Sequence, residues 1–231
     1  MELQWKRFVF GLSVLLFGLL VLSTASRAEK GANWMAKGVN VSKSLEPKVQ
    51  AEHSEKSIFR ASFVMFKTVH MEYVCTKLEL IQFFLLTEAS GTGKVRYTGC
   101  EFIIEGAPQW NCHPEVNGEA GVIETEKLKT LIVLHKSEGG STESLIRIEP
   151  SEGNVLAYVY NNKECGTTGA GFAGVAYIKD SNGQLGVEEV THLFAIGPLT
   201  KVVFATEATP VTFSGTEVLG IGGSSWSGLP A

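Results

Sequence analysis

The sequence predicts an all-β protein with an antiparallel β-sandwich or barrel-like fold that is cross-linked by disulfides. Three observations predict it. From residue 58 onward, the chain consists of short apolar or alternating runs that are rich in β-branched and aromatic residues. Clusters of Gly, Asn, Ser and Pro separate these runs, as turns separate strands in sandwiches and barrels. Four cysteines, an even number, follow an N-terminal segment that is typical of exported proteins.

Residues 1–28 have the order of a secretory signal peptide. Lys6 and Arg7 precede an apolar run over residues 8–22, and the small residues of STASRA follow it. Cleavage after Ala28 is favoured, and cleavage after Ala25 is the alternative. An uncleaved N-terminal anchor is also open, but the small-residue zone favours removal. We therefore expect a secreted or cell-surface protein that has no membrane span once the signal is removed.

Residues 29–57 are polar and lysine-rich and show little hydrophobic periodicity. We expect them to form a flexible or loosely docked N-terminal segment. Asn40 lies in an NVS sequon, which is a glycosylation acceptor in a eukaryotic secretory pathway. The β-sandwich domain is expected over 58–231, either as one large domain or as two small β subdomains. A mature chain of this length can bury a hydrophobic core.

The predicted strands are short runs between turn signals. In order they are IFRASFVMF, VHMEYVCTKLELIQFFLL, GKVRYTGCEFII, AGVIETEKLKTLIVLHK, ESLIRIEP, NVLAYVY, GFAGVAYIK, LGVEEVTHLFAI, LTKVVFAT and TPVTFSGTEVLGI. In ESLIRIEP, alternation places Leu145 and Arg147 on one face of the strand and Ile146 and Ile148 on the other. TEKLKTLIVLHK also fits a helix, but its Leu, Ile and Val content favours a strand.

Aromatic residues on these runs are expected to pack in the core, because large aromatic side chains in strands are usually buried. The alternative is a carbohydrate-stacking platform on the surface of a secreted protein. The residues expected in the core are Phe63, Phe66, Phe102, Tyr158, Tyr177, Phe194 and Phe204.

The four cysteines are expected to form two disulfides, because their spacings lack the Cys-x2–4-Cys pattern that zinc prefers. Gly106 lies midway between Cys100 and Cys112, so a hairpin that turns at EGA would bring these two cysteines face to face. This favours Cys100–Cys112 together with Cys75–Cys165. Four cysteines allow three connectivities, and the sequence leaves the other two open.

The charges argue against two classes of function. Without Glu2, Lys6, Arg7 and Arg27 of the signal peptide, the 20 basic and 24 acidic residues fall to 17 and 23, a net charge of −6. This mildly acidic balance argues against nucleic-acid binding. Asp180 is the one aspartate, and KDSNGQ predicts a turn around it. No aspartate then remains for a Ser-His-Asp triad or a calcium loop.

Several motifs resemble sites but lack required residues. EASGTGKV has Glu88 and Val95 where a phosphate-binding loop needs Gly and Ser or Thr, so we expect a glycine-rich hairpin loop. GSSWSG lacks the spacing of a nucleophile elbow. VEEVTHLF brings Glu188, Glu189 and His192 together, and we expect these on a solvated strand face. No catalytic, cofactor-binding or metal-ligating residue is therefore assigned, and no cofactor is expected.

One resemblance covers the chain from Cys75 to Gly228. The segments CTKLEL, GKVRYTGCEFIIEG, CHP, GVIETEKLKTLIVLHKSEGGSTESLIRIEP, NVLAYVYNNKECG, VTHLF and WSG together resemble a group of exported proteins predicted from soil actinobacterial genomes. That group has no assigned activity. The resemblance implies export from a bacterium, a β fold and the four-cysteine pattern, and no chemistry. In a bacterial host the NVS sequon has no role.

Two hypotheses for the function follow. The first is a non-catalytic exported protein that acts as a binding or structural module for a cell-surface or extracellular ligand. The second is a secreted, glycosidase-like hydrolase that uses two glutamates about 5–10 Å apart. A concave site with two buried glutamates near aromatic residues would favour the hydrolase. The missing catalytic residues favour the binding module.

Overall fold

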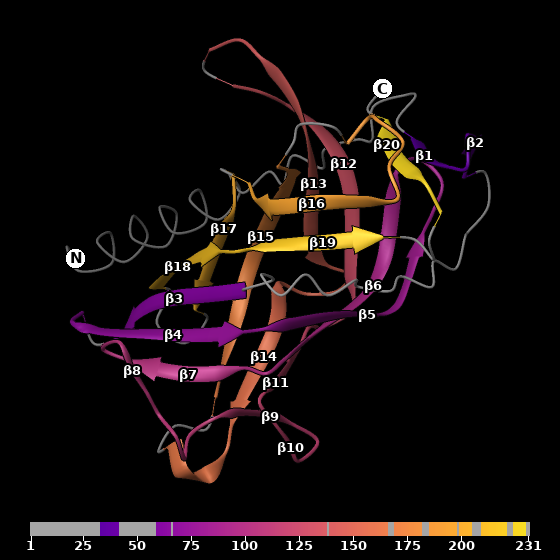
Figure 1. Ribbon diagram of the computed structural model, residues 1–231. Helices are drawn as coiled ribbons and strands as arrows, with labels where there is room; N and C mark the ends of the chain where they lie inside the picture. Colours follow the sequence, from indigo (N-terminus) through magenta and orange to yellow (C-terminus); the bar gives the residue numbers. More distant parts are fainter. Residues whose placement is uncertain are drawn as a thin grey trace, which may run out of the picture.

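The computed structural model describes residues 33–41, 59–65, 67–137, 139–165, 169–181, 185–197, 199–204, 209–220 and 224–229. These residues form antiparallel strands and one short 3-10 helix, η1 (Lys163–Cys165). The strands curl into a half-barrel (Figure 1), so the all-β prediction is confirmed. The predicted signal peptide over 1–28 lies outside the described residues.

The first wall of the half-barrel contains most of the long strands. Its strands are β5 (Lys77–Leu85), β6 (Ser90–Thr98), β11 (Val122–Glu124), β12 (Leu128–Lys136), β13 (Thr142–Pro150), β15 (Ala170–Asp180), β16 (Thr191–Ile196) and β19 (Thr216–Gly220). The pairing order is β5, β6, β12, β13, β15, β16 and β19, and β11 extends the wall beside β6. The strand predicted for TEKLKTLIVLHK is thus confirmed as β12.

The second wall is built from shorter strands. They are β3 (Phe59–Met65), β4 (Val69–Cys75), β7 (Glu101–Ile104), β8 (Ala107–Pro108), β9 (Pro114–Val116), β10 (Glu119–Ala120), β14 (Val155–Asn161), β17 (Lys201–Phe204) and β18 (Thr209–Ser214). β15 belongs to both walls, since its first half pairs with β14 and β17 and its second half with β13 and β16. The change of partners falls between Val175, which pairs with Lys201, and Ala176, which pairs with Ile148. At the neighbouring Gly174, a Cβ would lie 2.2 Å from the Lys201 carbonyl oxygen.

A disulfide between Cys75 and Cys100 joins two strands where both pass from one wall to the other. β4 continues into β5 and β6 continues into β7 at this corner. Val74 pairs with Glu101 and Lys77 pairs with Thr98, so Cys75 and Cys100 lie directly opposite each other, with their Cα atoms 3.9 Å apart. The second disulfide, Cys112–Cys165, links the segment after β8 to η1.

Both disulfides were predicted, but the favoured pairing of Cys100 with Cys112 and Cys75 with Cys165 was wrong. The predicted EGA hairpin exists as β7–β8, with Glu105 and Gly106 at positive φ in the turn. Its register pairs Ile103 with Pro108, which would bring Asn111 and not Cys112 opposite Cys100. The hairpin also ends at Pro108, before it reaches either cysteine.

A small third sheet closes one end of the first wall. It contains β1 (Asn33–Ala36), β2 (Val39–Asn40) and β20 (Trp226–Leu229), in the order β2-β1-β20. Within the segment 29–57, which was predicted to be flexible or loosely docked, residues 33–41 are docked, since Trp34 is buried and its indole Nε1 donates to the Ser90 carbonyl at 2.7 Å. Trp34 and Val41 both belong to a core cluster, and β1 pairs with β20, so buried side chains and backbone pairing together dock this segment.

The core has two clusters, one in each half of the molecule. Four of the seven aromatic residues predicted in the core are buried, namely Phe63, Phe102, Phe194 and Phe204, whereas Phe66 lies outside the described residues. The first cluster includes Phe63, Tyr73, Phe102, Phe172 and Phe204. The second includes Trp34, Ile132, Ile146, Phe194 and Trp226. Among the described residues, no helix is long and apolar enough to cross a membrane.

Candidate functional site

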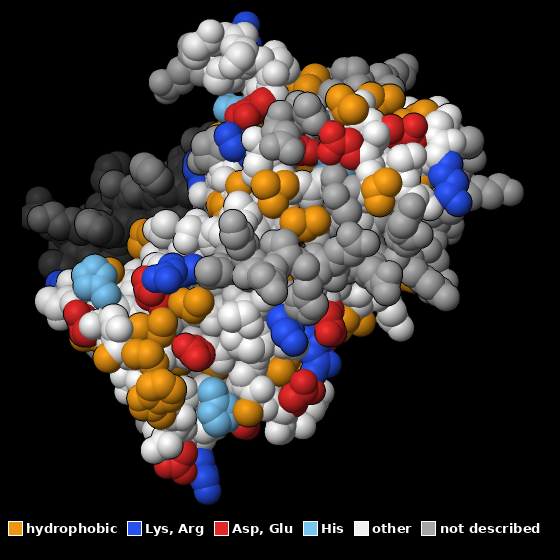
Figure 2. Space-filling view, viewed as in Figure 1, with side chains coloured by type: hydrophobic (Ala, Val, Ile, Leu, Met, Phe, Trp, Pro, Cys, Tyr) orange, Lys and Arg blue, Asp and Glu red, His pale blue; other side chains and the backbone are white. Residues whose placement is uncertain are grey.

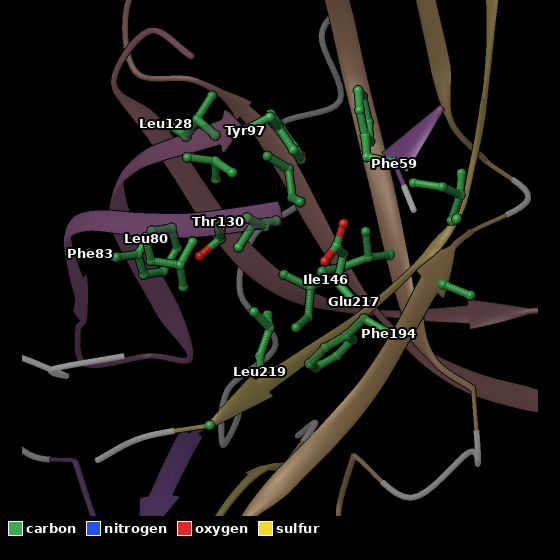
Figure 3. A pocket seen from close by; sticks show the side chains of 18 of the residues that line it. Phe59, Leu80, Phe83, Tyr97, Leu128, Thr130, Ile146, Phe194, Glu217 and Leu219 are labelled. Atoms are coloured by element: carbon green, nitrogen blue, oxygen red, sulfur yellow. The ribbon is translucent and has the colours of Figure 1, made fainter. Parts of the chain in front are cut away.

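A cavity of about 120 Å³ lies where the two core clusters meet, inside the curled sheet (Figure 3). β5, β6, β12 and β13 line it on one side, and β16 and β19 line it on the other. β3 contributes Phe59, while β1 and β20 contribute Trp34 and Trp226. The cavity is therefore lined by strands that come from most of the length of the described chain.

The lining of the cavity is almost entirely apolar. Its aliphatic side chains include Leu78, Leu80, Leu85, Leu128, Ile146, Ile148, Ile178 and Leu219, and its aromatic side chains include Phe59, Phe83, Tyr97 and Phe194. Alternation explains this composition, since side chains two positions apart on β5, β6, β12 and β13 point to the same face. Enclosed apolar cavities in other proteins are known to bind small apolar molecules.

Glu217 is the one charged residue among the described residues that line the cavity. It lies on β19, where it pairs across the sheet with Phe194 and shares a face with Leu219. Figure 3 shows its carboxylate among the carbon atoms of the apolar lining. Glu217, Thr130 and Ser214 are polar residues in an otherwise largely apolar lining.

Tyr97 lines the same cavity, and the Glu217 charge contributes to the raised pKa of its hydroxyl. Its ring stacks on Phe59 with the ring centroids 4.2 Å apart. Burial, and secondarily the Glu217 carboxylate, raise the pKa of the Tyr97 hydroxyl well above its usual value. Tyr97 therefore stays neutral at physiological pH and presents a hydroxyl and a stacked ring to the same space as Glu217.

Trp34 and Trp226 form the end of the cavity that the third sheet closes. Their rings lie 5.8 Å apart, and Trp226 also contacts Phe194. The Trp226 indole Nε1 is buried and has no hydrogen-bond partner among the described residues. A buried donor without an acceptor is costly, and such groups in native proteins often mark the place of a ligand or water.

Asp180 and His192 form a second polar feature, behind the cavity. Both are buried, and His192 Nδ1 lies 2.6 Å from Asp180 Oδ2. The other ring nitrogen, Nε2, lies 2.9 Å from the Trp226 carbonyl oxygen. In a catalytic triad that nitrogen faces a nucleophilic hydroxyl, so this pair has the geometry of a structural link between β15, β16 and β20.

Asp180 was expected in a turn between two strands; it is the last residue of β15, directly before the turn residue Ser181, and its carboxylate is buried. The prediction for His192 was wrong. His192 was expected with Glu188 and Glu189 on a solvated face, but its side chain is wholly buried and only Glu188 is exposed. Glu188 instead accepts a hydrogen bond from the Gly38 amide at 2.5 Å. Glu188 lies before β16 begins at Thr191, so strand alternation does not relate its side chain to that of His192.

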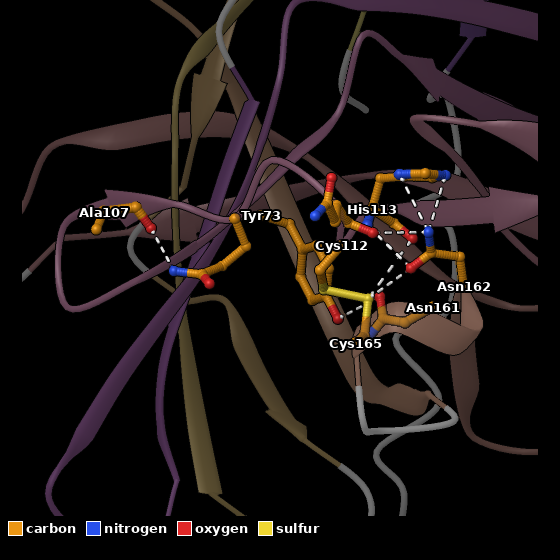
Figure 4. The surroundings of a disulfide bond; sticks show 9 residues. Tyr73, Ala107, Cys112, His113, Asn161, Asn162 and Cys165 are labelled. Carbon is orange, nitrogen blue, oxygen red and sulfur yellow. Dashed lines mark hydrogen bonds between the residues drawn. A yellow bond between two sulfur atoms is a disulfide. The ribbon is translucent and has the colours of Figure 1, made fainter.

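The Cys112–Cys165 disulfide is surrounded by a network of hydrogen bonds (Figure 4), as a structural cross-link is. The Asn162 amide NH donates to the His113 carbonyl at 3.0 Å, and its side-chain amide donates to the Asn111 carbonyl at 2.9 Å. Tyr73 donates to Asn161 at 3.1 Å. His113 thus lies beside a satisfied backbone network. All four cysteines are disulfide-bonded, and the described residues contain no group of three or more metal-ligating side chains.

Tyr158 corrects one of the core predictions, because 43% of its surface is exposed. Tyr158 and Tyr160 share the outer face of β14, while Ala157 and Val159 point into the core. The two tyrosine rings lie 6.3 Å apart with an angle of 28° between their planes. Elsewhere on the surface, Figure 2 shows Lys, Arg, Asp and Glu side chains interspersed over one face of the molecule.

No protein-family model, curated protein or solved structure matches the chain. The geometry of the cavity is accordingly the strongest guide to the function.

Proposed function

We propose that the protein is an exported binding protein that holds a small, largely apolar ligand in the cavity between its two core clusters. The cavity itself carries this proposal, because its described lining is apolar apart from a few groups such as Glu217 and Thr130. Apolar cavities of roughly 150 Å³ bind benzene, and this cavity, at about 120 Å³, is of similar size. The ligand, or the part of it that enters, is thus about the size of one aromatic ring.

Two further observations support an extracellular role. Both disulfides are typical of proteins that fold in an oxidising compartment. The predicted signal peptide would deliver the chain to such a compartment. The resemblance to exported actinobacterial proteins agrees with this location and adds no activity.

The cavity gives less support to the hydrolase hypothesis. A glycosidase needs two carboxyl groups that flank the bond to be cleaved. Among the described lining residues Glu217 is the one carboxylate, and the neighbours that face the cavity are mostly hydrocarbon. A single carboxylate in an apolar cavity suits recognition of a ligand better than hydrolysis of a sugar.

The test is to add benzene to the protein and to record methyl NMR spectra. We expect shifts confined to Leu and Ile methyl groups that line the cavity, such as Leu80, Leu128 and Ile146. Leu80→Trp places a larger ring in the cavity and should abolish these shifts. Leu134→Trp is the matched control, because Leu134 is exposed on β12 and does not line the cavity. Shifts scattered over the surface, or unchanged in Leu80→Trp, would refute the proposed site.

A further inference from the structure

Two tyrosines lie on the outer face of β14, away from the cavity. Tyr158 and Tyr160 are two positions apart on this strand, so their side chains share a face, and they are 43% and 57% exposed. Their ring centroids are 6.3 Å apart and their planes differ by 28°. The two rings therefore form a nearly flat aromatic surface in contact with solvent, which we call the tyrosine platform.

The neighbouring strand β15 leaves the tyrosine platform uncovered on one side. Tyr158 pairs with Gly171, which has no side chain to lay over the ring. Gly169 approaches Tyr160 so closely that a Cβ on Gly169 would lie 3.0 Å from the Tyr160 Cα. Glycines beside both tyrosines explain why two large aromatic side chains in the middle of a sheet are exposed.

A carboxylate lies at the other side of the tyrosine platform. Glu115 on β9 pairs directly with Tyr160, and β9 lies beside β14 near the bottom of Figure 1. Directly opposite residues of an antiparallel pair share a face, so the Glu115 side chain lies next to the Tyr160 ring. Beyond it, Ala120 pairs with Glu115 and adds only a methyl group. An ionised carboxylate accepts hydrogen bonds and repels anions.

These neighbours argue against nucleic acid, and the size of the surface argues against a protein partner. Single-stranded nucleic acid also stacks on aromatic rings, but it needs a positively charged groove. If a whole tyrosine offers about 200 Å², the exposed parts of Tyr158 and Tyr160 amount to about 200 Å². Trp110, which is 86% exposed, is at the same end of β14, because the Asn162 side chain donates to the carbonyl of the adjacent Asn111. Even with Trp110 the surface is about 400 Å², whereas a stable protein interface buries about 800 Å² per partner.

We propose that the tyrosine platform binds a neutral carbohydrate, a flat β-linked chain of sugar rings. A sugar ring of this type has an apolar face of C–H groups and a rim of hydroxyls. The face packs on the exposed tyrosine rings, and the rim donates hydrogen bonds to Glu115. The small angle between the tyrosine planes suits a chain whose successive rings lie nearly in one plane. This second site is separate from the cavity and goes beyond the proposed function.

The experiment titrates the full-length protein with cellohexaose and with chitohexaose, two neutral β-linked hexamers, by isothermal titration calorimetry. NMR of the aromatic ring signals locates the site. We expect saturable binding that shifts the ring signals of Tyr158 and Tyr160 and leaves the methyl groups of the cavity unchanged. The β-linked hexamer of glucuronic acid should bind at least about tenfold more weakly, because its carboxylates meet Glu115.

Substitutions test whether the rings carry the binding. Tyr158→Ala and Tyr160→Ala should each weaken the binding of cellohexaose by about tenfold, as the loss of one stacking contact predicts. Tyr160→Phe keeps the ring and should stay within about threefold of the wild-type affinity. Leu134→Ala is the matched control, because Leu134 is an exposed apolar residue on β12 and should keep the full affinity. Urea unfolding confirms that each variant is folded.

Two outcomes would overturn the inference. The first is that neither neutral hexamer binds at millimolar concentration, or that Tyr160→Ala binds as tightly as the wild-type protein. The second is that the protein forms a dimer that Tyr160→Ala abolishes, which would make the platform a protein interface. The wild-type titration and its ring shifts decide the inference even where the alanine variants fail to fold. Neither outcome bears on the cavity, which the benzene experiment tests separately.

Discussion

His192 and Asp180 are joined by a buried ion pair, with His192 Nδ1 2.6 Å from Asp180 Oδ2. The Trp226 carbonyl accepts from the other side of the same ring at 2.9 Å. With Asp180 ionised, both partners of the ring are acceptors, so each ring nitrogen donates. This arrangement ties β20 to β15 and β16, and Trp226 on β20 is part of the wall of the cavity. The ion pair therefore positions one end of the proposed binding site.

Removing one partner of this pair should destabilise the fold severely. His192→Leu removes the hydrogen-bonded partner at 2.6 Å from the buried Asp180 carboxylate, and breaking a buried pair in this way costs about 3–5 kcal/mol. We expect this loss in the free energy of unfolding by urea denaturation at neutral pH. The double variant Asp180→Leu/His192→Leu removes both charges and should recover much of the loss.

The control is the exposed pair between Lys179 and Glu143, whose charged atoms lie 3.8 Å apart with more than a third of each side chain accessible. Lys179→Ala should change the stability by less than about 1 kcal/mol, because solvent screens such pairs. Equal losses for His192→Leu and Lys179→Ala would contradict the account of the buried pair.

The connectivity of the disulfides gives a second prediction. Digestion of the unreduced protein after glutamate residues cleaves between Cys100 and Cys112, at Glu101 and Glu105. Mass spectrometry should then find Cys75 linked to Cys100 and Cys112 linked to Cys165. Trypsin is unsuitable, because the chain has no Lys or Arg between Cys100 and Cys112. A peptide in which Cys100 is linked to Cys112 would contradict the structure.

The two disulfides should also differ in their contribution to stability. They close loops with sequence separations of 25 and 53 residues. The chain-entropy relation gives about 3.5 and about 4 kcal/mol for these separations. Replacing Cys75 and Cys100 together by Ala, or Cys112 and Cys165 together, should lower the free energy of unfolding by these amounts.

Much of the fold could be predicted because local patterns set it. Alternation and β-branched content identified β12 and β13, and the EGA turn identified the β7–β8 hairpin. The disulfide pairing could not be predicted, because it depends on where two neighbouring strands turn the same corner at Cys75 and Cys100. That corner is a long-range feature of the half-barrel.

The candidate site was harder to predict for the same reason. Asp180 and His192 meet because β15 pairs with β16, and strand alternation alone does not reveal which face is buried. The one local signal for the cavity is that Glu217 shares a strand face with Leu219. A glutamate on an apolar face is conspicuous, but the sequence does not show that β5, β6 and β12 face it across the interior.

Gly93 provides a fourth prediction, at a place where the sequence suggested a loop. The glycines of SGTGK lie in β6, and the turn comes earlier, at residues 87–89. A Cβ on Gly93 would lie 2.4 Å from the Cα of Phe83, at the bulge of β5 between Ile81 and Phe84. Gly93→Ala should therefore lower the free energy of unfolding by at least about 2 kcal/mol, since backbone cannot move aside easily.

Gly139→Ala is the matched control for this substitution. Its added Cβ would have its nearest neighbour at 3.9 Å, and Gly139 lies in an exposed turn. We expect a change within about 0.5 kcal/mol in the same urea experiment. If both alanine variants were equally stable, the tight approach of β6 to the β5 bulge would be refuted.

Alkaline pH should weaken the fold through its buried tyrosines. Burial raises the pKa of Tyr73 to about 12, and it also raises the pKa of Tyr97, with a further contribution from Glu217. Below pH 10 both hydroxyls are protonated in the folded and the unfolded chain, so they cause no loss. Between pH 10 and pH 12 the unfolded chain releases protons that the folded protein retains, so stability falls as the pH rises.

For Tyr73 this linkage amounts to about 2 kcal/mol between pH 10 and pH 12. The measurement is urea unfolding at a series of pH values, with phenolate absorbance recorded on the folded and the unfolded protein. Tyr73→Phe has no hydroxyl to ionise, so its stability should fall less over this interval by about that amount. If the wild-type protein and Tyr73→Phe lost stability in parallel, Tyr73 would titrate as freely in the fold as in the unfolded chain, and the dry environment assigned to this ring would be wrong.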